Sequence, residues 1–84
     1  MKHFASPGFW ARFEKLPGPV QELAKANFEL LRANPRHPSL YFRKTSKYWS
    51  VRVGLHYRAL AVEVPEGFLW FWIGSHADYD KMLR

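Results

Sequence analysis

The sequence predicts an α+β fold in which an N-terminal helical hairpin packs on a roughly four-stranded antiparallel sheet, with a short C-terminal helix after it. Apolar residues recur every three or four positions in the first third of the chain, and every second position after Pro38. Short turns separate the later segments, and strands joined by hairpins form antiparallel sheets. The 84 residues (1–84) are expected to make a single domain.

Both expected helices have recognisable ends. Ser6 offers a capping hydroxyl before Pro7, which suits the first helical turn, and this helix is expected to continue to Leu16. Pro17-Gly18-Pro19 then breaks the chain. The second helix is expected to start near Pro19 and to end at Asn34-Pro35. One apolar stripe runs along it, formed by Val20, Leu23, Ala24, Phe28 and Leu31.

The rest of the chain is predicted to form strands. The expected strands are Leu40–Lys44, Tyr48–Val53, Tyr57–Val64 and Phe68–Ile73, with Lys2–Ala5 as a candidate short edge strand. The run Phe68–Ile73 is apolar throughout, which is typical of a strand covered on both faces. Thr45-Ser46-Lys47 and Pro65-Glu66-Gly67 are expected turns, and Ser75 is expected to cap the terminal helix.

Composition excludes several classes of protein. With 48% apolar and 18% aromatic residues, the chain is not intrinsically disordered. It has no cysteine, so disulfides and thiolate metal sites are excluded. His3, His37 and His56 lack metal-ligand spacing, and we expect no metal and no cofactor. The longest apolar stretch is too short to span a bilayer, and no signal peptide is evident, so we expect a cytoplasmic protein without a membrane partner.

Positive charge is concentrated in the middle of the chain. The net charge is +6, and no acidic residue lies between Glu29 and Glu63, a window that holds seven Lys or Arg residues. Such a block suits a polyanion or an acidic protein partner. We expect Arg43, Lys44 and Lys47 to bind RNA, although a basic block can also be only a solvated surface.

Four residues form a candidate catalytic set. The alternation of Tyr48–Val53 leaves Arg52 on the sheet face away from the helices, with Arg58 of the next strand within antiparallel reach. His76 and Tyr79 follow the last strand. Arginines can clamp a phosphate and stabilise a phosphorane formed by 2′-OH attack, His76 can protonate the leaving 5′ oxygen, and Tyr79 can stack on a base. These residues suffice for RNA cleavage without a metal.

Each of the four also has a structural interpretation. Arg52 can be a solvated strand residue, and Arg58 can pair with Asp78 or Asp80. His76 can help to begin the terminal helix, and Tyr79 can anchor that helix to the sheet.

Four segments in order resemble the RelE/ParE toxin superfamily. They are Asn34–Leu40 (NPRHPSL), Tyr48–Val53 (YWSVRV), Tyr57–Leu60 (YRAL) and Trp72–Tyr79 (WIGSHADY). The resemblance covers nearly the whole chain and implies a toxin of a type II toxin–antitoxin system. It further implies a ribosome-dependent, metal-independent mRNA endoribonuclease that inhibits translation and is held inactive by a small antitoxin.

The resemblance also carries over to single residues. Arg52 falls where the nucleases hold a basic active-site residue, Arg58 at the arginine that contacts the scissile phosphate, and His76 at the catalytic acid of histidine-using members. Tyr79 falls near the residue that positions the base. Two departures stand out: no carboxylate lies near Ser39–Phe42 to act as a general base, and Ser50 stands where certain members carry a lysine. A ParE-type DNA gyrase inhibitor without catalysis, or an inactive RNA- or protein-binding relative, is therefore the alternative function.

Overall fold

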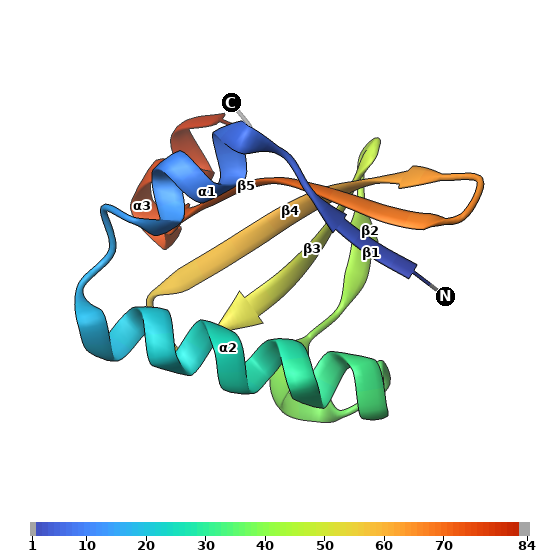
Figure 1. Cartoon of the computed structure of the whole chain (residues 1–84), viewed down its shortest axis with the longest axis horizontal. Helices are drawn as coiled ribbons and strands as arrows, with labels where there is room; N and C mark the ends of the chain where they lie inside the picture. Colours follow the sequence, from blue (N-terminus) through green and yellow to red (C-terminus); the bar gives the residue numbers. More distant parts are fainter. Residues whose placement is uncertain (1, 83–84) are drawn as a thin grey trace.

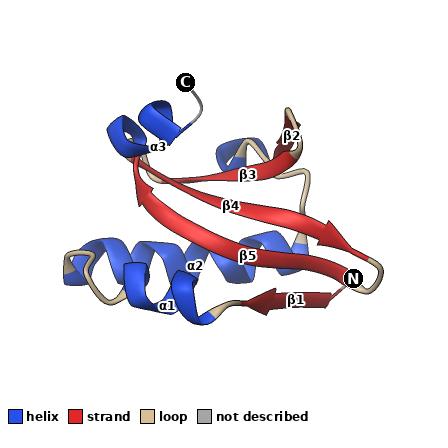
Figure 2. Cartoon of the chain, turned by 90° about the horizontal axis from the view of Figure 1, so that it is seen from above, coloured by secondary structure: helices blue, strands red, loops and turns tan. Residues whose placement is uncertain are grey.

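The computed structural model describes residues 2–82. The elements are β1 (Lys2–Ala5), α1 (Pro7–Phe13), α2 (Gly18–Ala33), a 3-10 turn η1 (Pro38–Leu40), β2 (Arg43–Thr45), β3 (Tyr48–Val53), β4 (Tyr57–Val64), β5 (Gly67–Ser75) and α3 (His76–Met82). The strands form one sheet in the order β1-β5-β4-β3-β2. Helices α1 and α2 cover one face of this sheet, and α3 lies on the other (Figures 1 and 2). The predicted α+β fold is confirmed.

The sheet has five strands, because the candidate edge strand Lys2–Ala5 joins the four others, and it is mixed rather than antiparallel. β1 pairs with β5 in parallel, whereas the β2–β3, β3–β4 and β4–β5 pairs are antiparallel. A parallel partner cannot be reached through a hairpin and requires a long crossover. Here the crossover is nearly the whole chain, because β1 pairs with the last strand. The strand at Lys2–Ala5 was predicted, but its parallel partner was not.

Both expected helices are present, and α1 has the expected side-chain cap. Ser6 Oγ accepts a hydrogen bond from Phe9 N (3.2 Å), which satisfies one free amide of the first turn of α1. α1 ends at Phe13 rather than Leu16. Gln21 Nε2 from α2 donates to Phe13 O (3.2 Å) and Leu16 O (3.0 Å), so a side chain of the second helix holds the turn after the first.

The segment before β2 differs from the expected strand Leu40–Lys44. Pro38–Leu40 forms a 3-10 turn, because His37 Nδ1 accepts a hydrogen bond from Ser39 N (3.2 Å) and Leu40 is completely buried. Tyr41 then takes a left-handed backbone conformation with φ 50°. β2 consequently begins only at Arg43 and ends at Thr45.

A bulge in the β4–β5 pair places two tryptophans on opposite faces. Leu60 pairs with Trp72 but Ala61 pairs with Trp70, so Phe71 is the extra residue. Trp70 therefore packs in the core beneath α1 and α2, whereas Trp72 packs with Leu60 and Tyr79 beneath α3. As predicted, β5 is covered on both faces.

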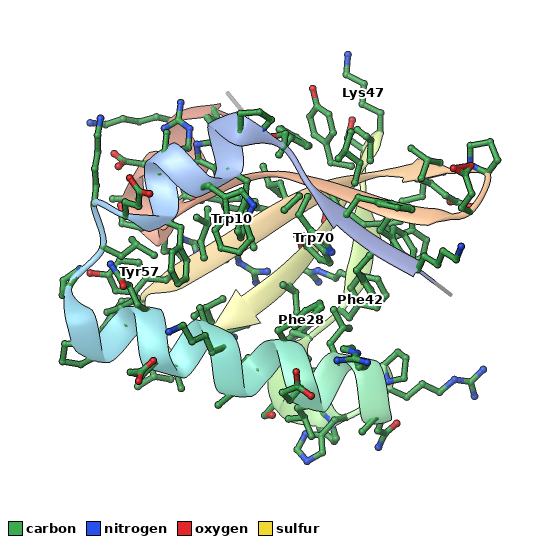
Figure 3. All side chains as sticks on the ribbon, viewed as in Figure 1. Trp10, Phe28, Phe42, Lys47, Tyr57 and Trp70 are labelled. Atoms are coloured by element: carbon green, nitrogen blue, oxygen red, sulfur yellow. The ribbon has the colours of Figure 1, made fainter. Side chains whose placement is uncertain are left out.

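The core on the helix side is aromatic. Phe42, Phe68 and Trp70 contact one another, with Phe42 and Phe68 ring centroids 5.3 Å apart. Figure 3 shows Phe28, Phe42 and Trp70 between α2 and the sheet. No helix within residues 2–82 has the length and apolar character that crossing a membrane requires.

Candidate functional site

Strand register gathers three arginines on the sheet face opposite α1 and α2. β3 pairs with β4 so that Arg52 lies opposite Arg58, and β2 pairs with β3 so that Arg43 lies opposite Ser50. Ser50 and Arg52 are two residues apart on one strand and share a face. Arg43, Arg52 and Arg58 are called the arginine cluster below. Asn27 Nδ2 of α2 donates to Arg52 O (3.2 Å), so the backbone of the cluster is tied to the helix.

Arg58 is the buried member of the cluster. Only 5% of its surface is exposed. Its Nη1 donates to Ser50 Oγ at 3.3 Å, and Ser50 is itself fully buried. Its Nε has no hydrogen-bond partner within residues 2–82. Buried donors are nearly always paired, so a free guanidinium N–H marks a site with unused binding capacity.

No carboxylate of residues 2–82 forms an ion pair with the arginine cluster. The ion pairs of this part of the chain join Lys25 to Glu22 and Arg32 to Glu29, and the His76 ring contacts the Asp80 carboxylate; none of these contacts includes an arginine of the cluster. The sequence left open a pair between Arg58 and Asp78 or Asp80, and the structure shows neither pair.

The electrostatics of Arg58 follow from this setting. Burial lowers the pKa of Arg58 most, and the charges of Arg43 and Arg52 lower it further, while Tyr79 and Asp80 act in the opposite direction. Arginine nevertheless stays protonated in proteins. Three cations without an ion-pair partner in the described part of the chain, one of them desolvated, have the chemistry to bind a multiply charged anion.

Tyr79 and His76 extend the site toward α3. The Arg58 guanidinium lies over the Tyr79 ring (5.2 Å to the centroid), and the His76 ring meets Tyr79 edge-on at 5.8 Å. Tyr79 is 6% exposed and packs against Trp72 and Leu60. It therefore anchors α3 to the sheet between Arg58 and His76, with little ring surface free for a base.

His76 stands at the start of α3 with half of its side chain exposed. Its backbone N donates to His56 O at 2.7 Å, which fixes its position at the end of β5. Its Nδ1 lies 3.3 Å from Asp80 Oδ2, one helical turn later. A carboxylate at one ring nitrogen orients the imidazole and leaves Nε2 for another partner.

The two lysines predicted to bind RNA lie away from the cluster. Lys44 pairs with Trp49, whose side chain packs on the helix-side core, so Lys44 points to the face opposite Arg43. Lys47 extends from the end of the β2–β3 hairpin, with its Nζ 6.0 Å from the Tyr48 ring (Figure 3). Of the three predicted RNA-binding residues, Arg43 alone joins the arginine cluster.

Residues 19–81 match the family described as the ParE-like toxin domain. The chain belongs to this ParE-like toxin family. The RelE/ParE resemblance that the sequence carries is thereby confirmed, and the domain is a toxin of the RelE/ParE type. No curated protein matches the chain.

Solved structures of toxins share the fold of this ParE-like domain. RelE in the RelB–RelE antitoxin–toxin complex of Methanococcus jannaschii aligns with a TM-score of 0.74 at 14% identity, over 96% of this chain and 99% of that one. Isolated E. coli RelE aligns with a TM-score of 0.63 at 14% identity, over 98% of this chain and 97% of that one. A copper-bound mutant toxin from Helicobacter pylori aligns with a TM-score of 0.62 at 14% identity, over 93% of this chain and 97% of that one.

Sequence reasoning missed three features of this ParE-like site. Asp80 was considered only as a partner of Arg58, although its i,i+4 spacing from His76 predicts the contact seen here. Ser50 was noted as a departure from the family pattern, but its hydrogen bond to Arg58 depends on strand register. Tyr41 was assigned to a strand, and no local signal places it beside two arginines.

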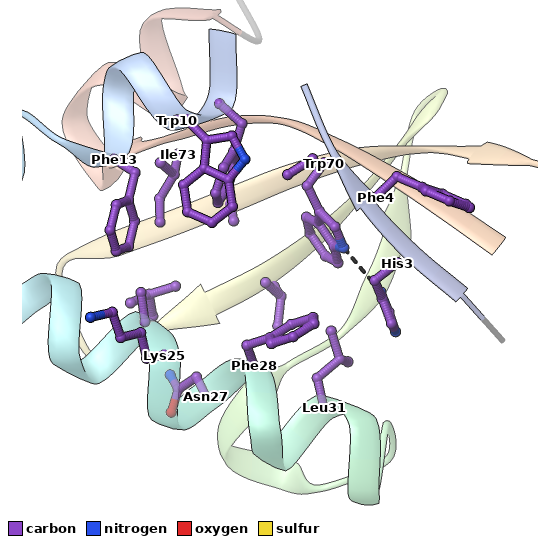
Figure 4. Close-up of a pocket in the computed structure, with 16 residues that line it drawn as sticks. His3, Phe4, Trp10, Phe13, Lys25, Asn27, Phe28, Leu31, Trp70 and Ile73 are labelled. Atoms are coloured by element: carbon purple, nitrogen blue, oxygen red, sulfur yellow. Dashed lines mark hydrogen bonds between the residues drawn. The ribbon is translucent and has the colours of Figure 1, made fainter. Parts of the chain in front are cut away.

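A separate apolar pocket of about 290 Å³ lies between α1, α2 and the helix-side face of the sheet (Figure 4). The rings of Trp10, Phe13, Phe28 and Trp70 line it. His3 Nδ1 accepts a hydrogen bond from Trp70 Nε1 at 3.0 Å, which ties β1 to the core. Burial lowers the pKa of His3, and the charge of Arg32 contributes to that shift.

Proposed function

We propose that this ParE-like domain cleaves mRNA on the ribosome and thereby inhibits translation. The observation that carries the proposal is the buried Arg58, whose Nε has no partner within residues 2–82, beside Arg43 and Arg52 with no carboxylate to neutralise them. A phosphodiester supplies the acceptors that this guanidinium lacks. A site that only needed a positive surface would not need to bury its arginine.

The same residues can carry the chemistry. The ribose 2′ oxygen attacks phosphorus as its proton passes to solvent, and the P–O5′ bond breaks. Arg58 and Arg52 stabilise the extra negative charge on the phosphorane. His76, oriented by Asp80, donates its proton to the leaving 5′ oxygen. The products are a 2′,3′-cyclic phosphate and a 5′ hydroxyl; side chains stabilise the charge and supply the acid, and solvent takes the 2′ proton.

Cell-free translation of a defined mRNA tests this function. We expect new RNA 5′ ends when ribosomes are translating and none with the naked mRNA. Arg58→Met should abolish the cuts. Arg36→Met should not, because it removes the same charge from an exposed arginine outside the cluster. Absence of cuts on translating ribosomes would refute the proposal.

A second candidate is inhibition of DNA gyrase, which the ParE-like family match favours. It needs a binding surface but no general acid. Inhibition of gyrase supercoiling without any RNA cleavage would select this function. If neither activity is present, the domain is an inactive relative that keeps only its binding surface.

We also propose a small acidic antitoxin as partner. Two observations support it: the net charge of +6, and the fold shared with RelE of the Methanococcus jannaschii RelB–RelE complex. An acidic disordered segment can wrap a large basic surface despite its ordering cost. We expect a small acidic protein to copurify from the native host at physiological salt and to block cleavage when added back. Purification without one would count against the partner.

A further inference from the structure

Tyr41 has an unusual place in the chain. Its neighbours are anchored in the core: Leu40 is completely buried, and the Phe42 ring lies 5.0 Å from Trp49. Tyr41 itself has φ 50° and is 48% exposed. A left-handed backbone is costly for a bulky residue, and here the anchored neighbours enforce it and turn the ring outward.

The ring lies beside two members of the arginine cluster. Arg43 Cζ is 4.6 Å and Arg52 Cζ 5.2 Å from its centroid. Among the described residues, no other ring has two cationic side chains within this range. Exposed cation–π contacts add little stability, so stability alone does not account for an exposed tyrosine in a strained conformation.

The position of this ring matters for a ligand on Arg58. Arg52 lies opposite Arg58, and Arg43 lies opposite its partner Ser50, so Tyr41 borders the anion site on the side away from α3. Tyr79, the aromatic residue on the other side, is buried. Among residues 2–82, Tyr41 is therefore the exposed aromatic residue whose ring contacts the arginine cluster.

We propose that Tyr41 is a stacking platform for a nucleobase of single-stranded RNA whose phosphate binds the arginine cluster. The proposal rests on the RNA-directed function above and adds the residue that distinguishes a nucleotide from a bare anion. Every base has a π-face, so the platform confers a requirement for a base rather than a hydrogen-bonded sequence code. Arg43 and Arg52 hold the Tyr41 ring and can also contact the phosphate backbone of the RNA.

Two anions of similar charge separate stacking from electrostatics. The first is a fluorescent single-stranded RNA oligonucleotide, and the second is the same ribose-phosphate strand made abasic. Binding of each is measured by anisotropy. We expect Tyr41→Ala to weaken binding of the RNA roughly ten- to hundredfold, the range for loss of one base–aromatic stack, and to change binding of the abasic strand less than twofold. Tyr41→Phe should retain wild-type affinity, because it keeps the ring.

Trp10→Ala is the matched control. Trp10 is 50% exposed but lies on the helix side of the sheet, so its loss should leave binding of both strands unchanged. If Tyr41→Ala weakens binding of the RNA and of the abasic strand equally, the ring only positions the arginines. If it weakens binding of neither, the ring takes no part in binding. Either result overturns the proposal.

The same assay separates this proposal from the proposed function. If RNA binds the wild type and Arg58→Met abolishes binding while Tyr41→Ala does not change it, the Tyr41 platform fails and the RNA-directed site stands. If the wild type binds neither strand, the Tyr41 platform fails, and cuts on translating ribosomes still decide the proposed function. Melting temperatures of all variants, measured in parallel, exclude loss of folding as the cause.

Discussion

Replacing Arg58 by methionine should make the protein more stable and inactive at once. Methionine fills much of the space of the arginine stem but carries no charge. Arg58 is 5% exposed, has one hydrogen bond, to Ser50 Oγ, and has no carboxylate partner within residues 2–82. The folded state therefore bears the desolvation of a cation that Tyr79 and Asp80 offset only in part, without an ion pair. Arg58→Met removes that cost.

The expected magnitude follows from the individual contacts. An unsatisfied buried donor such as Nε costs about 1–3 kcal/mol, and replacing buried ionic groups by apolar ones of similar volume is neutral or stabilising by about 1–4 kcal/mol. Against this, the buried Ser50 Oγ loses its 3.3 Å hydrogen bond and Tyr79 loses its cation–π contact, which together cost about 1–3 kcal/mol. We expect a net gain of up to about 2 kcal/mol, which raises the melting temperature of a domain of this size by up to about 15 °C.

Thermal unfolding and RNA cleavage should be measured on the same preparations. Cleavage by Arg58→Met should fall at least about a hundredfold, as for loss of one donor to the transition-state charge. Arg36→Met, which removes an exposed arginine, should change stability by less than about 0.5 kcal/mol and leave cleavage intact. A lower melting temperature for Arg58→Met would show that Arg58 is structural. Retained cleavage would show that the site lies elsewhere.

Three further predictions concern the acid, the salt dependence and the pH dependence. His76→Gln should keep ribosome binding and the melting temperature, but its single-turnover cleavage rate should fall about a hundred- to ten-thousandfold. Persistent cleavage with reduced stability would mean that His76 only helps to begin the helix. RNA affinity should fall by about one log unit per log of salt for each phosphate contacted, and a flat titration would contradict phosphate binding by the arginine cluster. Folding lowers the pKa of His3 below its unfolded value, so stability should be full above about pH 6.5 and decline as the pH falls towards the pKa of the folded state. The free energy of unfolding, measured by urea at pH 7.5 and pH 5, should differ less between the two pH values in His3→Gln than in the wild type. An equal difference in both proteins would mean that another group titrates.

Local signals in the sequence determined most of the secondary structure. Pro17-Gly18-Pro19 separated the helices because proline cannot continue the first helix but fits the first turn of the second. The two-residue alternation of Tyr48–Val53 assigned Arg52 to the face opposite the helices. The acid-free window from Glu29 to Glu63 also predicted that the middle of the chain suits a polyanion or an acidic protein partner. These features depend on neighbours within a few positions, which a sequence displays directly.

Tertiary structure decided the parts that turn this basic block into a site. Parallel pairing of β1 with β5, the bulge that turns Trp72 away from Trp70, and the burial of Arg58 against Ser50 each depend on residues brought together from separate strands. The outward position of Tyr41 likewise follows from the anchoring of Leu40 and Phe42 in the core. Periodicity assigns a residue to a face of its own strand, but register between strands determines which residues meet there and which charges remain without a partner.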